Sequence, residues 1–257
     1  MVNIEKILDP ITSKVFFTQY WRKKHLVIRR NKFRDIYGFK DLNNYLNRYP
    51  HVRGLQILDY DDNDTRWCLD KHKKLNQPKL TKQQVYEQWK KHGRTFVIPF
   101  AENENKSLND IVKALEQYFY KGQANVYASP KANSKSFPAH ADATENFLFH
   151  TEGKTKWTMY SDKGKTILDQ FTLDAGDLLY IPIGMYHKVE TVGARILVSI
   201  HFRNKKGQNL NTFKIGKDYD RDLWYNWTPD LPKQKTKRPV RLMNKRTWSK
   251  PYFNKKI

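Results

Sequence analysis

Apolar residues recur at helical spacing in three segments of the first 122 residues. Residues 1–24 form an amphipathic pattern, which Asp9-Pro10 interrupts. Two later segments carry apolar residues three or four positions apart, as expected for helices with one buried face: Phe39, Leu42, Tyr45, Leu46 and Tyr49, and then Leu108, Ile111, Val112, Leu115, Tyr118 and Phe119. Thr81 and Gln84 have the spacing of a capping box, so another helix is predicted to begin there. These stripes predict helices that pack on a core.

The pattern changes to short strand-like segments from about residue 123. Turn residues separate the predicted strands, which are 123–129, 144–151, 155–160, 166–173, 177–182, 186–192 and 194–203. Two further strands are predicted earlier, at 25–30 and 94–100. Strands at this spacing are typical of a small antiparallel barrel or sandwich. Because helices come first and strands after, the predicted class is α+β, mainly β.

The change of pattern divides the chain into three predicted parts. Residues 1–122 form an N-terminal helical and strand layer that packs on the barrel, 123–204 form the barrel core, and 205–257 form a C-terminal extension. Within that extension, residues 231–257 contain ten Lys and Arg and no Asp or Glu, with three aromatic residues among them. Basic and aromatic side chains together suit phosphate contact and base stacking, which predicts nucleic-acid contact. The alternative is a tail that packs its aromatic residues along the barrel.

Composition limits which binding partners and which cellular compartment are expected for the protein. A formal net charge of +22 favours polyanions, with nucleic acid or a nucleoprotein ahead of an acidic membrane. The single cysteine, Cys68, excludes an intrachain disulfide framework and a multi-thiolate zinc site, and it favours a reducing compartment. The sequence has no long apolar run and no signal-peptide core at its start. We therefore expect a cytoplasmic or nucleic-acid-associated protein without a membrane partner, whose oligomeric state the sequence does not define.

His140, Asp142 and His187 have the residue types and spacing of a metal site. Residues i and i+2 lie on the same side of an extended strand, so His140 and Asp142 can reach one ion together. The segment 174–187 predicts a turn, a buried strand and a second turn that delivers His187. Two imidazoles and one carboxylate can occupy one face of an octahedral ion and leave the other positions open. Considered alone, His140 and Asp142 also suit an ordinary surface loop or a hydrogen-bonded pair.

Several motifs, taken in their order along the chain, resemble those of the JmjC/cupin-like 2-oxoglutarate oxygenases, in particular of their ribosomal-oxygenase branch. They are Asn125-Val-Tyr-Ala-Ser-Pro130, Phe137-Pro-Ala-His-Ala-Asp142, Asn146-Phe-Leu-Phe-His-Thr-Glu-Gly-Lys-Thr-Lys-Trp157 and Asp177-Leu-Leu-Tyr-Ile-Pro-Ile-Gly-Met-Tyr-His187. The segment from Phe17 to Ile28 is similar to the entry segment of that branch, so the resemblance covers residues 1–204.

The resemblance implies a double-stranded β-helix, also called a jelly-roll or cupin core, that binds Fe(II) through His140, Asp142 and His187. It also implies 2-oxoglutarate as cosubstrate, which chelates the iron while O₂ takes the remaining position. The implied reaction is hydroxylation of a C–H bond, or demethylation where the oxidised carbon is a methyl group on nitrogen. The implied substrate is a protein, either ribosomal or otherwise associated with nucleic acid.

At the position expected to bind the far carboxylate of 2-oxoglutarate, this chain lacks the cationic residue that the family pattern has. Relatives usually carry Lys or Arg at the position of Thr155, whereas this chain has Lys154 and Lys156 on either side of it. A one-residue shift of the preceding turn would bring Lys156 inward, and Lys154 is the second choice. Arg195 on another strand is the alternative, and both lysines can also be solvated turn residues.

The resemblance assigns further residues to the same pocket. Asn146 matches a position near the cosubstrate, and Tyr127 and Ser199 add hydroxyl groups from other strands. His150 and His201 are expected beside the site, behind the residues that contact ligands. An ordinary buried polar group of a barrel is the alternative for each of these residues.

Two functions of different classes therefore remain open. The first is an Fe(II)- and 2-oxoglutarate-dependent dioxygenase that acts on a protein or nucleoprotein. The second is a non-catalytic, metal-binding cupin that binds nucleic acid or ribonucleoprotein through its basic surface.

Overall fold

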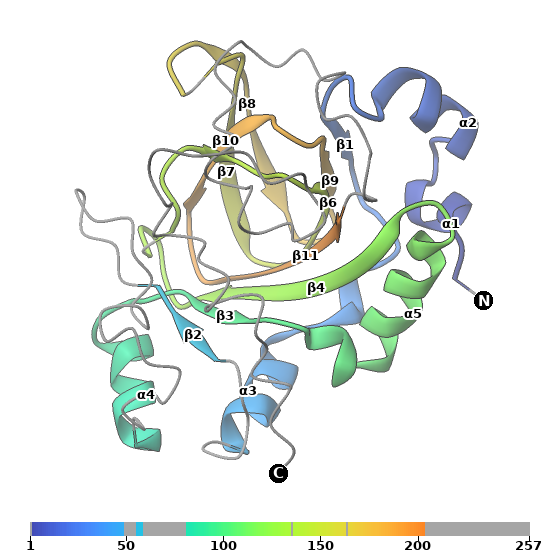
Figure 1. Cartoon of the computed structure of the whole chain (residues 1–257). Helices are drawn as coiled ribbons and strands as arrows, with labels where there is room; N and C mark the ends of the chain where they lie inside the picture. Colours follow the sequence, from blue (N-terminus) through green and yellow to red (C-terminus); the bar gives the residue numbers. More distant parts are fainter. Residues whose placement is uncertain (1, 49–54, 59–80, 135, 163, 204–257) are drawn as a thin grey trace, which may run out of the picture.

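The computed structural model of the chain describes residues 2–48, 55–58, 81–134, 136–162 and 164–203 (Figure 1). Every structural statement below concerns these residues. The basic extension at 205–257, with its predicted nucleic-acid contact, lies outside them, as does Cys68.

Two antiparallel sheets form the body of the molecule. The larger sheet has seven strands in the order β1 (Leu26–Ile28), β9 (Leu178–Ile181), β6 (Glu145–Glu152), β11 (Arg195–Arg203), β4 (Tyr120–Ser129), β3 (Phe96–Ile98) and β2 (Gln56–Ile57). The smaller sheet has four strands in the order β5 (His140–Ala141), β10 (Tyr186–Thr191), β7 (Lys154–Tyr160) and β8 (Ile167–Asp174). The strands predicted after residue 123 agree with the observed ones to within a few residues, which confirms the predicted class, α+β and mainly β.

Helices cover the outer face of the larger sheet, where α5 runs alongside β4 (Figure 1). In chain order the helical elements are α1 (Ile4–Leu8), α2 (Ser13–Val15), the π-helical turn η1 (Phe16–Tyr20), η2 (Arg34–Ile36), α3 (Phe39–Asn47), α4 (Lys82–Lys90), η4 (Ala101–Asn103) and α5 (Lys106–Glu116). The capping box at Thr81 is present, because the Thr81 hydroxyl accepts from the Gln84 amide and the Gln84 side chain accepts from the Thr81 amide. None of the described helices is long and apolar enough to cross a membrane.

The N-terminal layer is continuous with the barrel. Strands β1, β2 and β3 come from the first 122 residues, yet all three belong to the larger sheet. Arg22 anchors the entry segment, because its Nε donates to Glu145 Oε1 at 2.8 Å. The Tyr180 hydroxyl donates to the other oxygen of that carboxylate at 2.6 Å. The N-terminal segment therefore helps to hold β6 and β9 in place.

Strand β6 is buried on both of its faces because two separate cores meet on it. Phe147 and Phe149 pack outward against the helices, while Leu148 belongs to the inner core between the two sheets. That inner core contains residues from both sheets: Leu148, Trp157, Met159, Leu173, Leu179, Ile181, Met185, Val189 and Leu197. The alternation along each strand places every second residue of β4, β6, β7, β10 and β11 inside the barrel.

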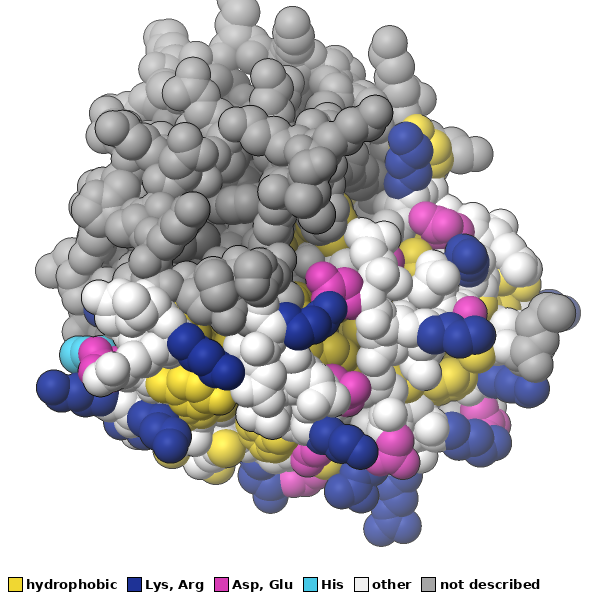
Figure 2. Space-filling model, turned by 90° about the horizontal axis from the view of Figure 1, so that it is seen from below, with side chains coloured by type: hydrophobic (Ala, Val, Ile, Leu, Met, Phe, Trp, Pro, Cys, Tyr) yellow, Lys and Arg dark blue, Asp and Glu magenta, His cyan; other side chains and the backbone are white. Residues whose placement is uncertain are grey.

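Charged side chains are distributed over the described surface. In Figure 2, Lys and Arg side chains alternate with Asp and Glu and with apolar patches on the visible described atoms. Several are paired, including Lys106 with Asp110 at 2.5 Å and Lys154 with Asp174 at 3.0 Å. The described surface in this view therefore has mixed charge.

Gly153 closes the turn between β6 and β7 in a conformation that a side chain cannot adopt without displacement. Its φ is +75°, and a Cβ atom would lie 1.9 Å from the carbonyl oxygen of Ala194. We expect Gly153→Ala to lower the free energy of unfolding by about 1–3 kcal/mol from backbone strain alone. The clash with Ala194 adds to this loss. Gly193→Ala is the matched control, since nothing lies within 4 Å of the added Cβ. Urea unfolding of the two variants checks this, and equal midpoints would contradict it.

Candidate metal centre

The register between β5 and β10 brings two histidines together. His140 and His187 are direct partners in this antiparallel pair, so both side chains lie on one face of the smaller sheet. Their ring centroids are 4.5 Å apart. Asp142 follows β5 and stands two residues after His140, which places its carboxylate on the same side.

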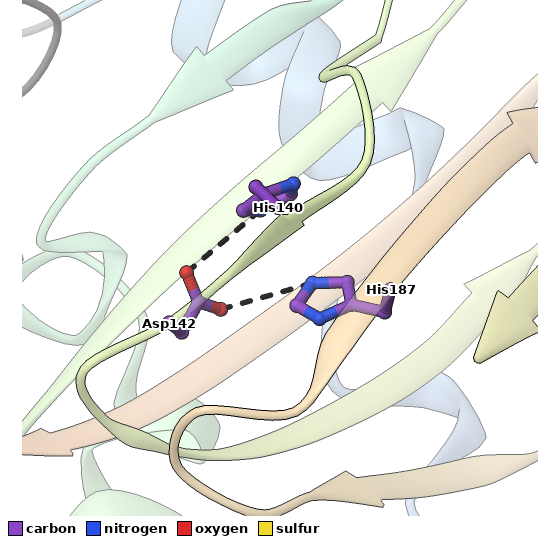
Figure 3. Close-up of side chains that lie close together, drawn as sticks. All are labelled: His140, Asp142 and His187. Atoms are coloured by element: carbon purple, nitrogen blue, oxygen red, sulfur yellow. Dashed lines mark ion pairs between the residues drawn. The ribbon is translucent and has the colours of Figure 1, made fainter. Parts of the chain in front are cut away.

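The three side chains converge on one point (Figure 3). His140 Nε2 lies 3.8 Å from Asp142 Oδ1, and His187 Nε2 lies 3.9 Å from Asp142 Oδ2. One donor atom from each residue falls within 4.8 Å of the others. The structure thus brings together the three residues that the sequence predicted as ligands.

Backbone carbonyl groups fix the orientation of both imidazole rings. Nδ1 of His140 lies 2.8 Å from the Pro138 oxygen, and Nδ1 of His187 lies 2.9 Å from the Met185 oxygen. A carbonyl oxygen only accepts, so in each neutral ring Nδ1 carries the proton and Nε2 keeps its lone pair. Burial, and then the neighbouring His140, lower the pKa of His187 to about 4. His187 is therefore neutral at physiological pH, with a lone pair directed at the site.

Asp142 is held from two directions. Its Oδ2 accepts a hydrogen bond from Asn146 Nδ2 at 2.6 Å, and its backbone oxygen accepts from the Gly184 amide at 2.7 Å. Gly184 has a φ of +79° in the turn that precedes β10, so this contact joins the two ligand-bearing loops. Asn146 therefore lies beside the site, as predicted, and orients the Asp142 carboxylate.

A pocket of about 590 Å³, with its open mouth included, extends from the metal centre into the barrel. Its lining includes five of the other predicted site residues, Tyr127, Asn146, Arg195, Ser199 and His201, together with Asn125, Ser136, Phe137, Leu148, Trp157, Val189 and Leu197. Burial and the nearby Asp142 raise the pKa of Tyr127 well above its usual value, so the phenol keeps its proton.

The expectation that Lys156 or Lys154 points into the pocket is wrong. Both lysines are exposed, and Lys154 pairs with Asp174 across β7 and β8. The register shift that would have turned Lys156 inward does not occur, because β7 begins directly after Gly153. Instead Thr155 and Trp157 face the interior, and the Trp157 indole donates to the Thr155 hydroxyl at 2.9 Å. Thr155 therefore lies inside the barrel without supplying a charge.

Arg195, the alternative named from the sequence, lies in the pocket wall. Its side chain is 1% exposed, and its Nε donates to Ser129 Oγ at 3.2 Å. Burial lowers its pKa to about 10, so the guanidinium remains charged at neutral pH.

His150 is fully buried on the pocket side of β6, opposite Leu197, but it is not among the lining residues. Burial, and then the charge of Arg195, lower the pKa of His150 to about 3, so the ring is neutral.

Asn125 and Trp157 are among the lining residues that were not singled out from the sequence. Asn125 Oδ1 accepts from Gln123 Nε2 at 2.9 Å and stands two residues before Tyr127 on β4. Trp157 stands two residues after Thr155 on β7. In both cases the two-residue period of a strand, applied to a predicted neighbour, would have identified the residue.

Comparison with known proteins agrees with this fold. Residues 95–210 match the JmjC domain. Ribosomal oxygenase 2 of Rattus norvegicus is 29% identical over 229 residues, which cover 80% of this chain and 47% of the rat protein. The bifunctional lysine-specific demethylase and histidyl-hydroxylase NO66 of Drosophila mojavensis is 25% identical over 212 residues, which cover 72% of this chain and 23% of that protein. The chain is therefore similar to JmjC-domain proteins of the ribosomal-oxygenase branch, and it spans half the length of these relatives or less.

Solved structures show the same fold. The structure of YcfD, a ribosomal oxygenase from Escherichia coli, matches with a TM-score of 0.57 at 14% identity, covering 89% of this chain and 61% of that one. A second structure of YcfD, in complex with cobalt and 2-oxoglutarate, matches with a TM-score of 0.56 at 14% identity, with coverages of 89% and 62%. These likenesses confirm the predicted double-stranded β-helix.

The residues present fit the Fe(II) and 2-oxoglutarate that this family implies. Two imidazoles and one carboxylate are a donor set suited to Fe(II), and all three residues line the same pocket. The pocket also offers Asn, Ser, Tyr and Arg side chains to an anionic ligand.

We expect Asn146→Ala to weaken metal binding about 10- to 100-fold, because the amide that orients the Asp142 carboxylate is lost. Titration with Mn(II) in a calorimeter, without any cosubstrate, measures the dissociation constant. Ser199→Ala is the control, since Ser199 lines the pocket from β11 but is not one of the three ligands. Equal dissociation constants for both variants would show that Asn146 does not support the ligand.

Proposed function

We propose that the chain is an Fe(II)- and 2-oxoglutarate-dependent dioxygenase that oxidises a side chain of a protein, one that is ribosomal or otherwise associated with nucleic acid. The observation that carries the proposal is the arrangement of His140, Asp142 and His187. The three donors occupy one side of the site and leave the side toward the pocket open.

Bound together, Fe(II) and 2-oxoglutarate supply the oxidising chemistry: O₂ oxidises a substrate C–H bond to an alcohol while 2-oxoglutarate becomes succinate and CO₂. The chain's own residues hold and shape the site. His140, Asp142 and His187 bind the ion, and Asn146 orients the carboxylate. Leu148, Trp157, Val189 and Leu197 form apolar pocket walls that exclude water from the reacting groups.

Support for a protein substrate comes from the relatives. Two of them are named as a ribosomal oxygenase and as a lysine-specific demethylase and histidyl-hydroxylase. Both names describe proteins that act in the setting of ribosomes or on amino-acid side chains. Hydroxylation is the reaction that we propose, and oxidation of an N-methyl carbon by the same site would end in demethylation.

Turnover tests the proposal directly. Purified protein with Fe(II), 2-oxoglutarate, O₂ and a ribosomal-protein preparation is expected to form succinate and to add one oxygen atom to a substrate peptide, as detected by mass spectrometry. We expect His140→Ala and Asp142→Ala to abolish both signals, because each variant removes a ligand. His92→Ala, a change at an exposed histidine outside the pocket, is expected to leave them unchanged.

A non-catalytic nucleic-acid-binding cupin would behave differently. It would bind metal and form no succinate, and its affinity for nucleic acid would fall steeply with salt and be the same in His140→Ala. That combination of results would contradict the proposed function.

A further inference from the structure

Arg195 is the one cationic side chain among the described residues that line the pocket. Its side chain is 1% exposed, and within the described part of the chain its Nη1 has no hydrogen-bond partner. Its Nε donates a hydrogen bond to the Ser129 hydroxyl. Neither Asp nor Glu forms an ion pair with it among the described residues. A buried guanidinium with an unpartnered nitrogen therefore stands in the pocket wall.

A buried charge without a counter-ion is unfavourable, because the guanidinium loses its hydration and gains no opposite charge in return. Such an unsatisfied buried group calls for an explanation in the function of the site. A guanidinium is matched best by a carboxylate or phosphate, which accepts from two of its N–H groups at once. The unpartnered Nη1 of Arg195 thus favours an anionic ligand that enters the pocket.

Strand β11 connects this cation with the metal centre. Its alternate residues, Arg195, Leu197, Ser199 and His201, all line the pocket. His201 is paired with Asn146, the residue that holds Asp142, so that end of β11 lies at the metal centre. Arg195 lies at the other end of the strand, beside Gly153 and Ser129. A ligand that lies between the metal centre and the Arg195 guanidinium needs metal-binding oxygens at one end and an anion at the other.

We propose that Arg195 holds the far carboxylate of 2-oxoglutarate, so that the cosubstrate is anchored from β11 of the larger sheet and not from β7 of the smaller one. This inference rests on the proposed function and assigns the residue that selects its cosubstrate. On β7, Thr155 faces inward with its hydroxyl bonded to Trp157, and Lys154 and Lys156 face solvent. No described residue of β7 therefore offers a charge to the pocket.

Comparing two ligands measures how much the far carboxylate contributes to binding. 2-Oxoglutarate and 2-oxobutyrate present the same 2-oxo acid group to the metal, but only 2-oxoglutarate carries the second carboxylate. With Mn(II)-loaded protein in a calorimeter, we expect wild type to bind 2-oxoglutarate about 10- to 100-fold more tightly than 2-oxobutyrate. In Arg195→Met this preference is expected to disappear while the affinity for 2-oxobutyrate stays the same. Arg195→Lys is expected to retain part of the preference, and Lys156→Met all of it.

The stability of the ligand-free protein separates a binding role from a structural one. Arg195→Met removes a buried charge, and Ser129 keeps its hydrogen bond with the Thr95 hydroxyl at 2.9 Å. We therefore expect the melting temperature of ligand-free Arg195→Met to equal or exceed that of wild type. The increase that 2-oxoglutarate gives to the Mn(II)-loaded wild type is expected to be lost.

A second variant tests whether a cation placed on β7 can replace Arg195. In the double variant Thr155→Lys/Arg195→Met, the new ammonium group comes from a β7 position whose side chain is buried inside the barrel. We expect this variant to regain preference for 2-oxoglutarate over 2-oxobutyrate. A double variant that binds 2-oxobutyrate normally but has no such preference would count against a carboxylate subsite between Thr155 and Arg195.

The outcomes distinguish this inference from the proposed function. If Arg195→Met keeps the preference of wild type, or loses both ligands equally, Arg195 does not hold the carboxylate, whereas the proposed function stands. If Mn(II)-loaded wild type binds 2-oxoglutarate no better than 2-oxobutyrate, the inference and the proposed function both fail. Loss of preference in Arg195→Met with unchanged binding of 2-oxobutyrate supports both.

Discussion

The pairing of β5 with β10 is the constraint on which the site depends. It sets His140 directly opposite His187, and the hydrogen bond from the Gly184 amide to the Asp142 oxygen holds the third ligand beside them. A slip of one residue in this register would turn one histidine to the opposite face and leave no common point for an ion. The inner core fixes the register from behind, because Trp157, Met159 and Val189 pack against strands of the larger sheet.

A buried positive charge is the second feature that organises the barrel. An uncompensated charge in the interior costs several kcal/mol, which is a large part of the roughly 5–15 kcal/mol by which a typical domain is stable. Arg195 carries that cost at the end of β11, while the neutral His150 and Tyr127 beside it add no further charge. The pocket therefore combines metal ligands at one end with a cation in its wall, which suits a ligand with acid groups at both ends.

Local patterns in the sequence were sufficient for most of the strands, because alternation and turn residues depend on neighbours in the chain, but not for β2 and β5. They also named the three residues that the structure brings together as candidate ligands. They were not sufficient for the cosubstrate anchor. Lys154, Thr155 and Lys156 are adjacent, so a shift of one residue decides which of them faces inward, and only the turn at Gly153 determines it. Arg195 lies forty residues later, and its approach to the same wall follows from sheet pairing. Nor did the pattern after residue 123 reveal that β1, β2 and β3 extend the larger sheet.

A crystal structure with Mn(II) and N-oxalylglycine, an unreactive mimic of 2-oxoglutarate, tests the central claim most directly. We expect one ion bound by His140, Asp142 and His187, with the oxalyl oxygens of the mimic on its pocket side. We also expect the far carboxylate of the mimic within hydrogen-bonding distance of the free Nη1 of Arg195. A mimic whose far carboxylate contacts other groups, or a pocket that takes up the ion without the mimic, would contradict the account.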